Sequence, residues 1–146
     1  MSAKKVLDIS KVLKNTKGEP MKDGNDPATL GRYLRMYINS MHVTLDQRMS
    51  VEQAGLGWEL QKQFDQLADS GENELRMSIK QHDLLRALAS DGRYIVGQDF
   101  QGPKCGKMPP GIMVQVSDMV EAAQSVEDVD VAATNGQAER RSKSRV

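Results

Sequence analysis

The sequence predicts a small, mainly α-helical domain of the α+β class, with an N-terminal β-hairpin, three to four helices and an extended C-terminal tail. All six aromatic residues fall between Tyr33 and Phe100, and large aromatic side chains anchor hydrophobic cores. Proline, which interrupts helices, is absent from residues 28–102. Within this stretch apolar residues recur with helical spacing. We therefore expect one domain over residues 1–102 and a linker with a polar tail over residues 103–146.

The composition is typical of a soluble protein of a reducing compartment. Of the 146 residues, 20 are Lys or Arg and 20 are Asp or Glu, and this balance argues against a globally basic nucleic-acid-binding protein. A single cysteine excludes an intrachain disulfide bond. No stretch approaches the ~20 apolar residues of a membrane span, and the N-terminus lacks the apolar run of a signal peptide. We expect a cytoplasmic protein without a membrane partner.

The first segment, residues 6–21, is predicted to form the β-hairpin. Its apolar residues have a spacing that fits either a helix or a strand. Asn15–Gly18 has the composition of a turn, and Glu19–Met21 can return as a short strand, which favours the hairpin. A loop rich in Asp, Gly and Asn follows over residues 23–27.

The clearest element is a helix that begins after Thr29, whose hydroxyl group is placed to cap the first turn. Apolar residues then recur at i, i+3, i+4, i+7, i+8 and i+11, which is one continuous stripe on a helix. They are Leu30, Tyr33, Leu34, Tyr37, Ile38 and Met41. Gly31 is unfavourable in a helix by up to ~1 kcal/mol relative to alanine. It either allows a close approach of the hairpin or is a glycine tolerated in the first turn.

Two further helices are predicted downstream. The second covers about residues 45–68, but two capping-box matches, Thr44–Gln47 and Ser50–Gln53, leave its start open. The third begins after Ser78 and stops at a Ser-Asp-Gly sequence. Between these helices, Glu74–Met77 alternates between polar and apolar residues and suggests a short extended piece.

The remaining segments have weaker patterns. Tyr94–Phe100 is too short for periodicity to distinguish a helix from a strand. Residues 102–111 are a linker rich in Gly and Pro, and residues 116–123 allow a short amphipathic helix. Residues 117–131 contain five acids and no base, whereas residues 140–145 are basic. This composition predicts a tail that is disordered or that gains structure only on a partner.

No catalytic or cofactor-binding motif is present, so we expect neither an enzyme nor a bound cofactor. Cys105 lies in the linker and lacks the rigid scaffold and neighbouring base that a catalytic cysteine needs. His42 and His82 are far apart in the sequence and match no metal-site spacing. We expect His82 at the edge of the core or on the surface.

The candidate interaction residues are all basic: Arg32, Arg35, Arg140, Arg141, Lys143 and Arg145. Two of them lie beside the tyrosines of the first helix, and aromatic residues near arginines can stack nucleic-acid bases. The apolar stripe that carries these tyrosines more often faces a core. The four residues at the chain end would contact phosphates, RNA or an acidic partner, or they belong to a solvated tail.

Several short motifs resemble those of small accessory or structural proteins of tailed bacteriophages. They are Gly18-Glu19-Pro20, an Asp/Gly/Asn loop, Thr29-Leu30-Gly31 opening an apolar helix, a later serine-capped helix and Val96-Gly97-Gln98. The resemblance covers about residues 9–100 and implies a viral origin and a non-enzymatic role. It carries no binding residue over to this chain.

These observations together predict a non-catalytic, phage-encoded protein that binds other proteins, either as a virion component or as an assembly factor. Its expected partners are other phage proteins or further copies of itself, located in the host cytoplasm or the virion, and no small-molecule substrate is evident. The alternative is a nucleic-acid-binding or host-regulatory protein that acts through a basic patch and the tail. Nucleic acid is the less favoured partner because the charge is balanced.

Overall fold

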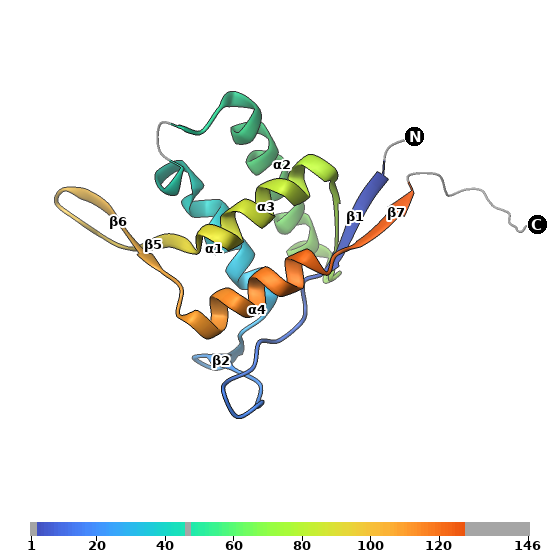
Figure 1. The fold of residues 1–146 in the computed structure, drawn as a ribbon, viewed down its shortest axis with the longest axis horizontal. Coiled ribbons are helices and arrows are strands. Elements are labelled where there is room, and N and C mark those ends of the chain that lie inside the picture. The colour runs from blue at the N-terminus through green and yellow to red at the C-terminus, as the bar shows by residue number, and fades with distance from the viewer. Residues whose placement is uncertain (1–2, 46–47, 128–146) are drawn as a thin grey trace, which may run out of the picture.

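The structure, a computed structural model, describes residues 3–45 and 48–127. These residues form a mixed α+β domain, as predicted, in which four helices pack together and small antiparallel sheets lie at the edges of the helical body (Figure 1). The helices are α1 (Leu30–Thr44), α2 (Val51–Ser70), α3 (Ile79–Asp91) and α4 (Pro110–Glu121). The strands are β1 (Ala3–Asp8), β2 (Lys22–Asp23), β3 (Asp26–Pro27), β4 (Glu74–Ser78), β5 (Arg93–Asp99), β6 (Gly102–Lys107) and β7 (Gln124–Glu127).

Helix α1 is the centre of the core. It contacts α2, α3 and α4, and all six apolar residues of its predicted stripe are buried. Burial of each large apolar side chain contributes about 1.5–3 kcal/mol, so this stripe dominates the stability of the helix. Thr29 caps α1 as predicted, because its hydroxyl oxygen accepts a hydrogen bond from the Arg32 N–H at 3.4 Å.

Serine caps set the beginnings of α2 and α3. The Ser50 hydroxyl accepts from the Gln53 N–H, and the Gln53 side chain accepts from the Ser50 N–H. This complete capping box resolves the open start of the second helix, which begins at Val51. Ser78 opens α3 with the same arrangement, as predicted, and α3 ends at Gly92, whose φ of 73° is left-handed.

The three-stranded sheet is assembled from distant parts of the chain. Its strand order is β4-β1-β7, and β1 is antiparallel to both neighbours. Leu7 of β1 lies opposite Leu75 of β4, and both side chains are buried. Exposed and buried residues alternate along β4, which confirms the predicted extended piece. One face of the sheet therefore joins the helical core.

The structure differs from the predicted N-terminal hairpin. Strand β1 pairs with β4 and β7 and not with the residues around Pro20. The turn at Asn15–Gly18 is present, but its flanks form an isolated bridge, Lys14 with Pro20, instead of two strands. Pro20 has no N–H to donate to a ladder, and pairing with the larger sheet buries Leu7, which a two-stranded hairpin would leave in solvent.

Residues 103–127 belong to the folded domain, which differs from the linker and tail expected after residue 102. Strand β6 pairs with β5, α4 packs against α3, and β7 completes the sheet. Val116 and Val120 of α4 lie one helical turn apart and are fully buried. The prolines that suggested a linker instead open a helix at Pro110, where the missing N–H costs nothing. Residues 128–146, the rest of the predicted tail, lie outside the described residues.

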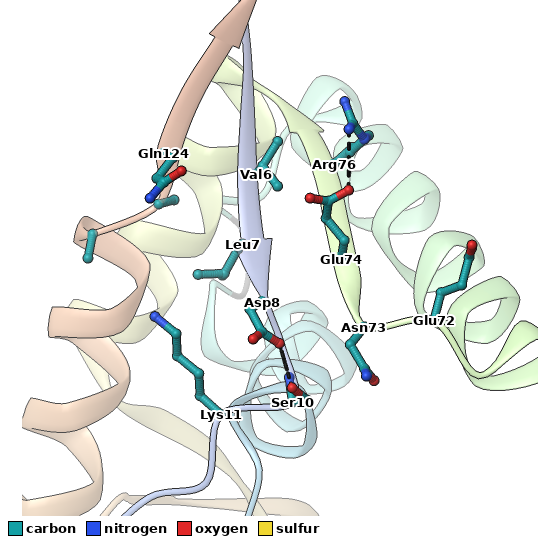
Figure 2. Close-up of a pocket in the computed structure, with 12 residues that line it drawn as sticks. Val6, Leu7, Asp8, Ser10, Lys11, Glu72, Asn73, Glu74, Arg76 and Gln124 are labelled. Carbon is teal, nitrogen blue, oxygen red and sulfur yellow. Dashed lines mark hydrogen bonds and ion pairs between the residues drawn. The ribbon is translucent and has the colours of Figure 1, made fainter.

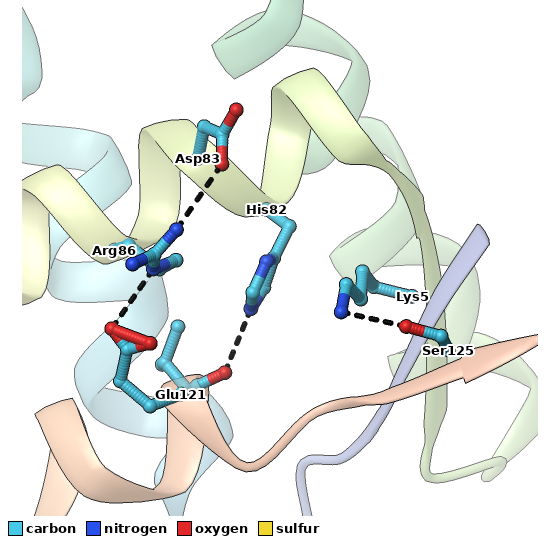
Figure 3. A network of polar contacts seen from close by, with 7 residues as sticks. Lys5, His82, Asp83, Arg86, Glu121 and Ser125 are labelled. Carbon is cyan, nitrogen blue, oxygen red and sulfur yellow. Dashed lines mark hydrogen bonds and ion pairs between the residues drawn. The ribbon is translucent and has the colours of Figure 1, made fainter. Parts of the chain in front are cut away.

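Polar contacts fasten the end of α4 to α3 (Figure 3). His82, expected at the core edge or on the surface, is buried, and its Nε2 lies 2.8 Å from the carbonyl oxygen of Val120. The Nε of Arg86 donates to a carboxylate oxygen of Glu121 at 2.9 Å. A hydrogen bond and an ion pair thus hold adjacent residues of α4 on the same face of α3.

Gly31 marks the closest approach of the N-terminal segment to α1. Its N–H donates to the carbonyl oxygen of Ile9 at 2.9 Å, and a Cβ at Gly31 would lie 3.2 Å from both that oxygen and the Ile9 Cβ. The structure thus favours the close-approach interpretation of this glycine.

We expect Gly31→Ala to lower the free energy of unfolding by about 1 kcal/mol, because overpacking against a backbone oxygen outweighs the gain in helix propensity. Gly55→Ala in α2 is the matched control, since a Cβ there meets nothing within 4 Å. It should raise stability by about 0.5–1 kcal/mol. Urea denaturation of both variants measures the difference, and equal gains would show that the contact with Ile9 is loose.

Candidate interaction surface

A two-stranded arm, residues 93–107, projects from the helical body (Figure 1). Within the described residues, β5 and β6 pair with each other and with no third strand. Their register shifts between Ile95 and Gly97, which is a bulge in the ladder. The segment Tyr94–Phe100, which periodicity left open, is therefore a strand followed by the start of a turn.

Side chains at the base of the arm anchor it to α1 and α3. The Arg93 guanidinium donates to Asp91 Oδ2 and to the carbonyl oxygen of Thr44, both at 2.8 Å. The buried hydroxyl of Ser40 accepts from the Ile95 N–H at 2.9 Å. These contacts fix the direction in which the arm leaves the body.

Replacing Ser40 by alanine should therefore lower stability by about 1–2 kcal/mol, because the Ile95 N–H loses its acceptor at a partly buried site. We also expect faster amide hydrogen exchange in the arm. Ser70→Ala at the exposed end of α2 is the control and should change stability by less than ~0.5 kcal/mol. If the two variants are equally stable and exchange alike, Ser40 does not anchor the arm.

The tip of the arm presents an aromatic side chain to solvent. Phe100 is 96% exposed. The turn around it is fixed because Asp99 Oδ1 accepts from the Gln101 N–H at 2.8 Å. Gly102 adopts a φ of 118°, a conformation that few other residues tolerate. Val96, on the same arm, is 54% exposed, so the arm carries two apolar side chains that the domain itself does not cover.

A second exposed apolar feature, the α1–α2 hollow, lies between α1 and the first half of α2. Its volume is about 230 Å³. The residues that line it are Ile38, Met41, His42, Met49, Ala54, Gly57, Trp58 and Gln61. Trp58 is 60% exposed, and Trp and Met are enriched at protein interfaces over the rest of the surface.

The structure places both predicted arginines of α1 along one groove, of about 730 Å³. Each is already paired with a carboxylate. The Nε of Arg32 donates to Asp23 at 2.7 Å, and the Nη2 of Arg35 donates to Asp65 at 2.9 Å. The Arg35 guanidinium also lies 5.9 Å from the centre of the Phe64 ring. The paired carboxylates offset the positive charge that would attract a nucleic-acid phosphate to this groove.

The tyrosines beside these arginines do not form a stacking platform for bases. Tyr33 and Tyr37 are buried in the core. Desolvation by burial is the main cause that raises the pKa of both, in Tyr37 to about 12. The four basic candidates at the chain end, Arg140, Arg141, Lys143 and Arg145, lie outside the described residues.

A further groove, of about 780 Å³, runs between β1, the start of β4 and the end of α4 (Figure 2). Two of its carboxylates are engaged with neighbouring side chains. The Ser10 hydroxyl donates to Asp8 at 2.6 Å and lowers the pKa of that carboxyl, and Arg76 pairs with Glu74 at 3.2 Å. Among the residues that line the groove there is no nucleophile with a neighbouring histidine or cysteine, so its chemistry points to no particular reaction.

The described part of the chain contains neither a cluster of metal-ligating side chains nor a membrane-spanning helix. There, no cluster of three or more His, Cys, Asp or Glu side chains is placed to hold a metal ion. None of the helices formed by those residues has both the length and the apolar character needed to cross a bilayer. Cys105 is exposed on β6, within the arm.

Comparisons of the chain with protein-family models, curated proteins and solved structures found no match. By its fold, the described part of the chain is a mixed α+β domain that carries a projecting β arm. Its candidate interaction surfaces are the arm tip and the α1–α2 hollow.

The two aromatic residues at these surfaces were not singled out from the sequence. Phe100 stands directly before Gln-Gly-Pro, a sequence that predicts a turn. An aromatic residue at a turn is not part of the apolar stripe of a helix, and this position could have indicated that Phe100 is exposed. Trp58 lies two residues before Leu60, which is buried in the core. That spacing places the two side chains on different faces of a helix.

Proposed function

We propose that the chain is a non-catalytic, phage-encoded interaction protein that acts as a virion component or an assembly factor. The observation that carries this proposal is the anchored arm with Phe100 at its tip. A rigid, exposed aromatic side chain loses little conformational entropy on binding, and aromatic residues are frequent hot spots of protein interfaces. The phage origin rests on the sequence resemblance over residues 9–100.

The contacts of the other surfaces favour protein over nucleic acid as the partner. Arg32 and Arg35 are neutralised by carboxylates of the same chain, whereas binding to phosphates relies on clustered, unpaired positive charge. An exposed phenyl ring and an exposed indole ring are typical of surfaces that other proteins cover.

Mass spectrometry of purified phage particles and of assembly intermediates tests the proposal. We expect the protein in one of these fractions, and we expect Phe100→Ser to reduce its amount there at least tenfold, since loss of a hot spot costs ≥ 2 kcal/mol. Val114→Ser, at an exposed position of α4, is the matched control and should leave the amount unchanged. Absence of the wild-type protein from both fractions, with no phage protein bound in a pull-down, would refute the proposal.

A further inference from the structure

We propose that the lysine loop, residues 11–22, binds the phosphate backbone of double-helical nucleic acid. The loop holds one acid, Glu19, and four lysines, Lys11, Lys14, Lys17 and Lys22, and all four lysines are exposed. In Figure 1 the loop, in blue, extends past α4 at the bottom of the view, whereas the arm leaves the body at the left. This inference goes beyond the proposed function, because it gives the chain a second partner on a face separate from the arm.

The positive charge of the loop is not neutralised within the described residues. None of its four lysines forms an ion pair with a carboxylate there. Of the nearby acids, Glu19 accepts a hydrogen bond from the Asn15 side chain at 3.1 Å, and Asp23 is paired with Arg32. Residues 11–32 as a whole have five bases and three acids, so the surplus stays positive.

Most other bases of the described residues are already paired with carboxylates. They are Arg32, Arg35, Lys62, Arg76, Lys80, Arg86, Arg93 and Lys104. Binding to phosphates relies on clustered, unpaired positive charge. The same requirement that argues against the arginines of α1 therefore points to the lysine loop.

Backbone contacts hold the loop in a fixed shape. Leu13 is fully buried. The N–H and the carbonyl oxygen of Lys14 both bind the side-chain amide of Gln115 on α4, each at 2.8 Å. Asn15 Oδ1 accepts from the N–H groups of Lys17 at 2.9 Å and Glu19 at 3.0 Å. The lysines thus project from a backbone that does not have to be ordered on binding, which lowers the entropic cost of association.

The composition of the loop favours a nucleic acid over an acidic protein. Large exposed hydrophobic side chains of the described residues all lie elsewhere, at Val51, Trp58, Ile79, Val96, Phe100 and Val114. Lysine is depleted at protein interfaces, whereas its ammonium group binds phosphate as a point charge. The loop contains no aromatic residue on which an unpaired base could stack, which favours a double helix over a single strand. Because backbone contacts carry no sequence information, we expect binding to any duplex.

Fluorescence anisotropy of a labelled DNA duplex titrated with the full-length protein is the test. With four phosphate contacts, the affinity should fall about 100-fold between 50 and 200 mM salt. The double variant Lys14→Gln/Lys17→Gln should bind at least tenfold more weakly at 50 mM salt, and its affinity should fall only about tenfold over the same range. Both lysines are exposed, so we expect circular dichroism to show a folded protein.

The matched control is Lys62→Gln/Lys80→Gln, which changes the net charge by the same amount. These lysines are already paired, with Glu59 and Glu52, so the control should bind like the wild-type protein. A duplex of RNA is the second probe, and tighter binding of either duplex identifies the nucleic acid.

Four results would each overturn the proposal. They are no binding of either duplex at 50 mM salt, equal weakening in the two double variants, binding that is lost when Arg140, Arg141, Lys143 and Arg145 are replaced by glutamine but kept in the loop variant, and equally tight binding of polyglutamate through the same lysines. The last result would identify an acidic protein as the partner of the loop. The Phe100→Ser experiment on phage particles is independent of all four, so the proposed function stands or falls separately.

Discussion

Replacing Val116 by aspartate is expected to unfold the domain. The side chain is fully buried where α4 packs against α3, and an unpaired carboxylate at such a site costs several kcal/mol after relaxation of the protein. Total stabilities of small domains are only about 5–15 kcal/mol, so most of the folded population should be lost. Thermal unfolding followed by circular dichroism measures this directly.

The control for this prediction is Val114→Asp, two residues earlier in the same helix. Val114 is 58% exposed, and a charge there should change stability by less than ~0.5 kcal/mol. If residues 103–127 were a solvated tail, both substitutions would be harmless. Equal melting temperatures of the two variants would therefore contradict the packing of α4.

Replacing Tyr37 by phenylalanine is expected to remove a large part of the alkaline sensitivity of the protein. Burial, followed by the nearby Tyr94 and Asp91, raises the pKa of Tyr37 to about 12 in the folded state, whereas an unfolded tyrosine ionises at about 10. Between these pH values the unfolded chain releases a proton that the folded protein keeps. The stability contribution of Tyr37 is therefore fully present below pH ~10 and is lost as the pH rises to about 12.

The expected size of the effect is about 2–3 kcal/mol between pH 9 and 12. Denaturant titrations of wild-type and Tyr37→Phe protein at several pH values give the free energy of unfolding of each. The contribution of the lysines cancels in the difference between the two proteins. At neutral pH the two proteins should differ by less than ~1 kcal/mol, because the Tyr37 hydroxyl has no hydrogen-bond partner among the described residues. Parallel stability curves up to pH 12 would contradict the deep burial of this side chain.

The helices were the part of the fold that the sequence predicted best, because their signals are local. The stripe from Leu30 to Met41 and the capping boxes at Ser50 and Ser78 depend on residues within a few positions of one another. The structure confirms the stripe and the cap at Ser78, and it resolves the choice between the two possible starts of α2.

The sheet and the C-terminal elements were not predictable in this way. Strand β1 meets β4 and β7, and nothing near Val6 in the sequence indicates either partner. Pro109 and Pro110 suggested a linker, although proline also opens helices. Of the candidate site residues, Arg32 and Arg35 are adjacent but paired with carboxylates. The sequence did not indicate that Trp58 and Phe100 are exposed; this follows from the fold, whose core does not include them.

The central position of β1 has a consequence for the order of events during translation. Lys5 and its contact Ser125 are separated by 120 positions. At about 5–20 residues per second, the ribosome needs roughly 6–24 s after making β1 to make β7, which is the second strand that pairs with β1. Until then the nascent chain carries an unpaired strand edge, which is a template for pairing with other chains. The last elements of the domain therefore also protect its first strand from aggregation.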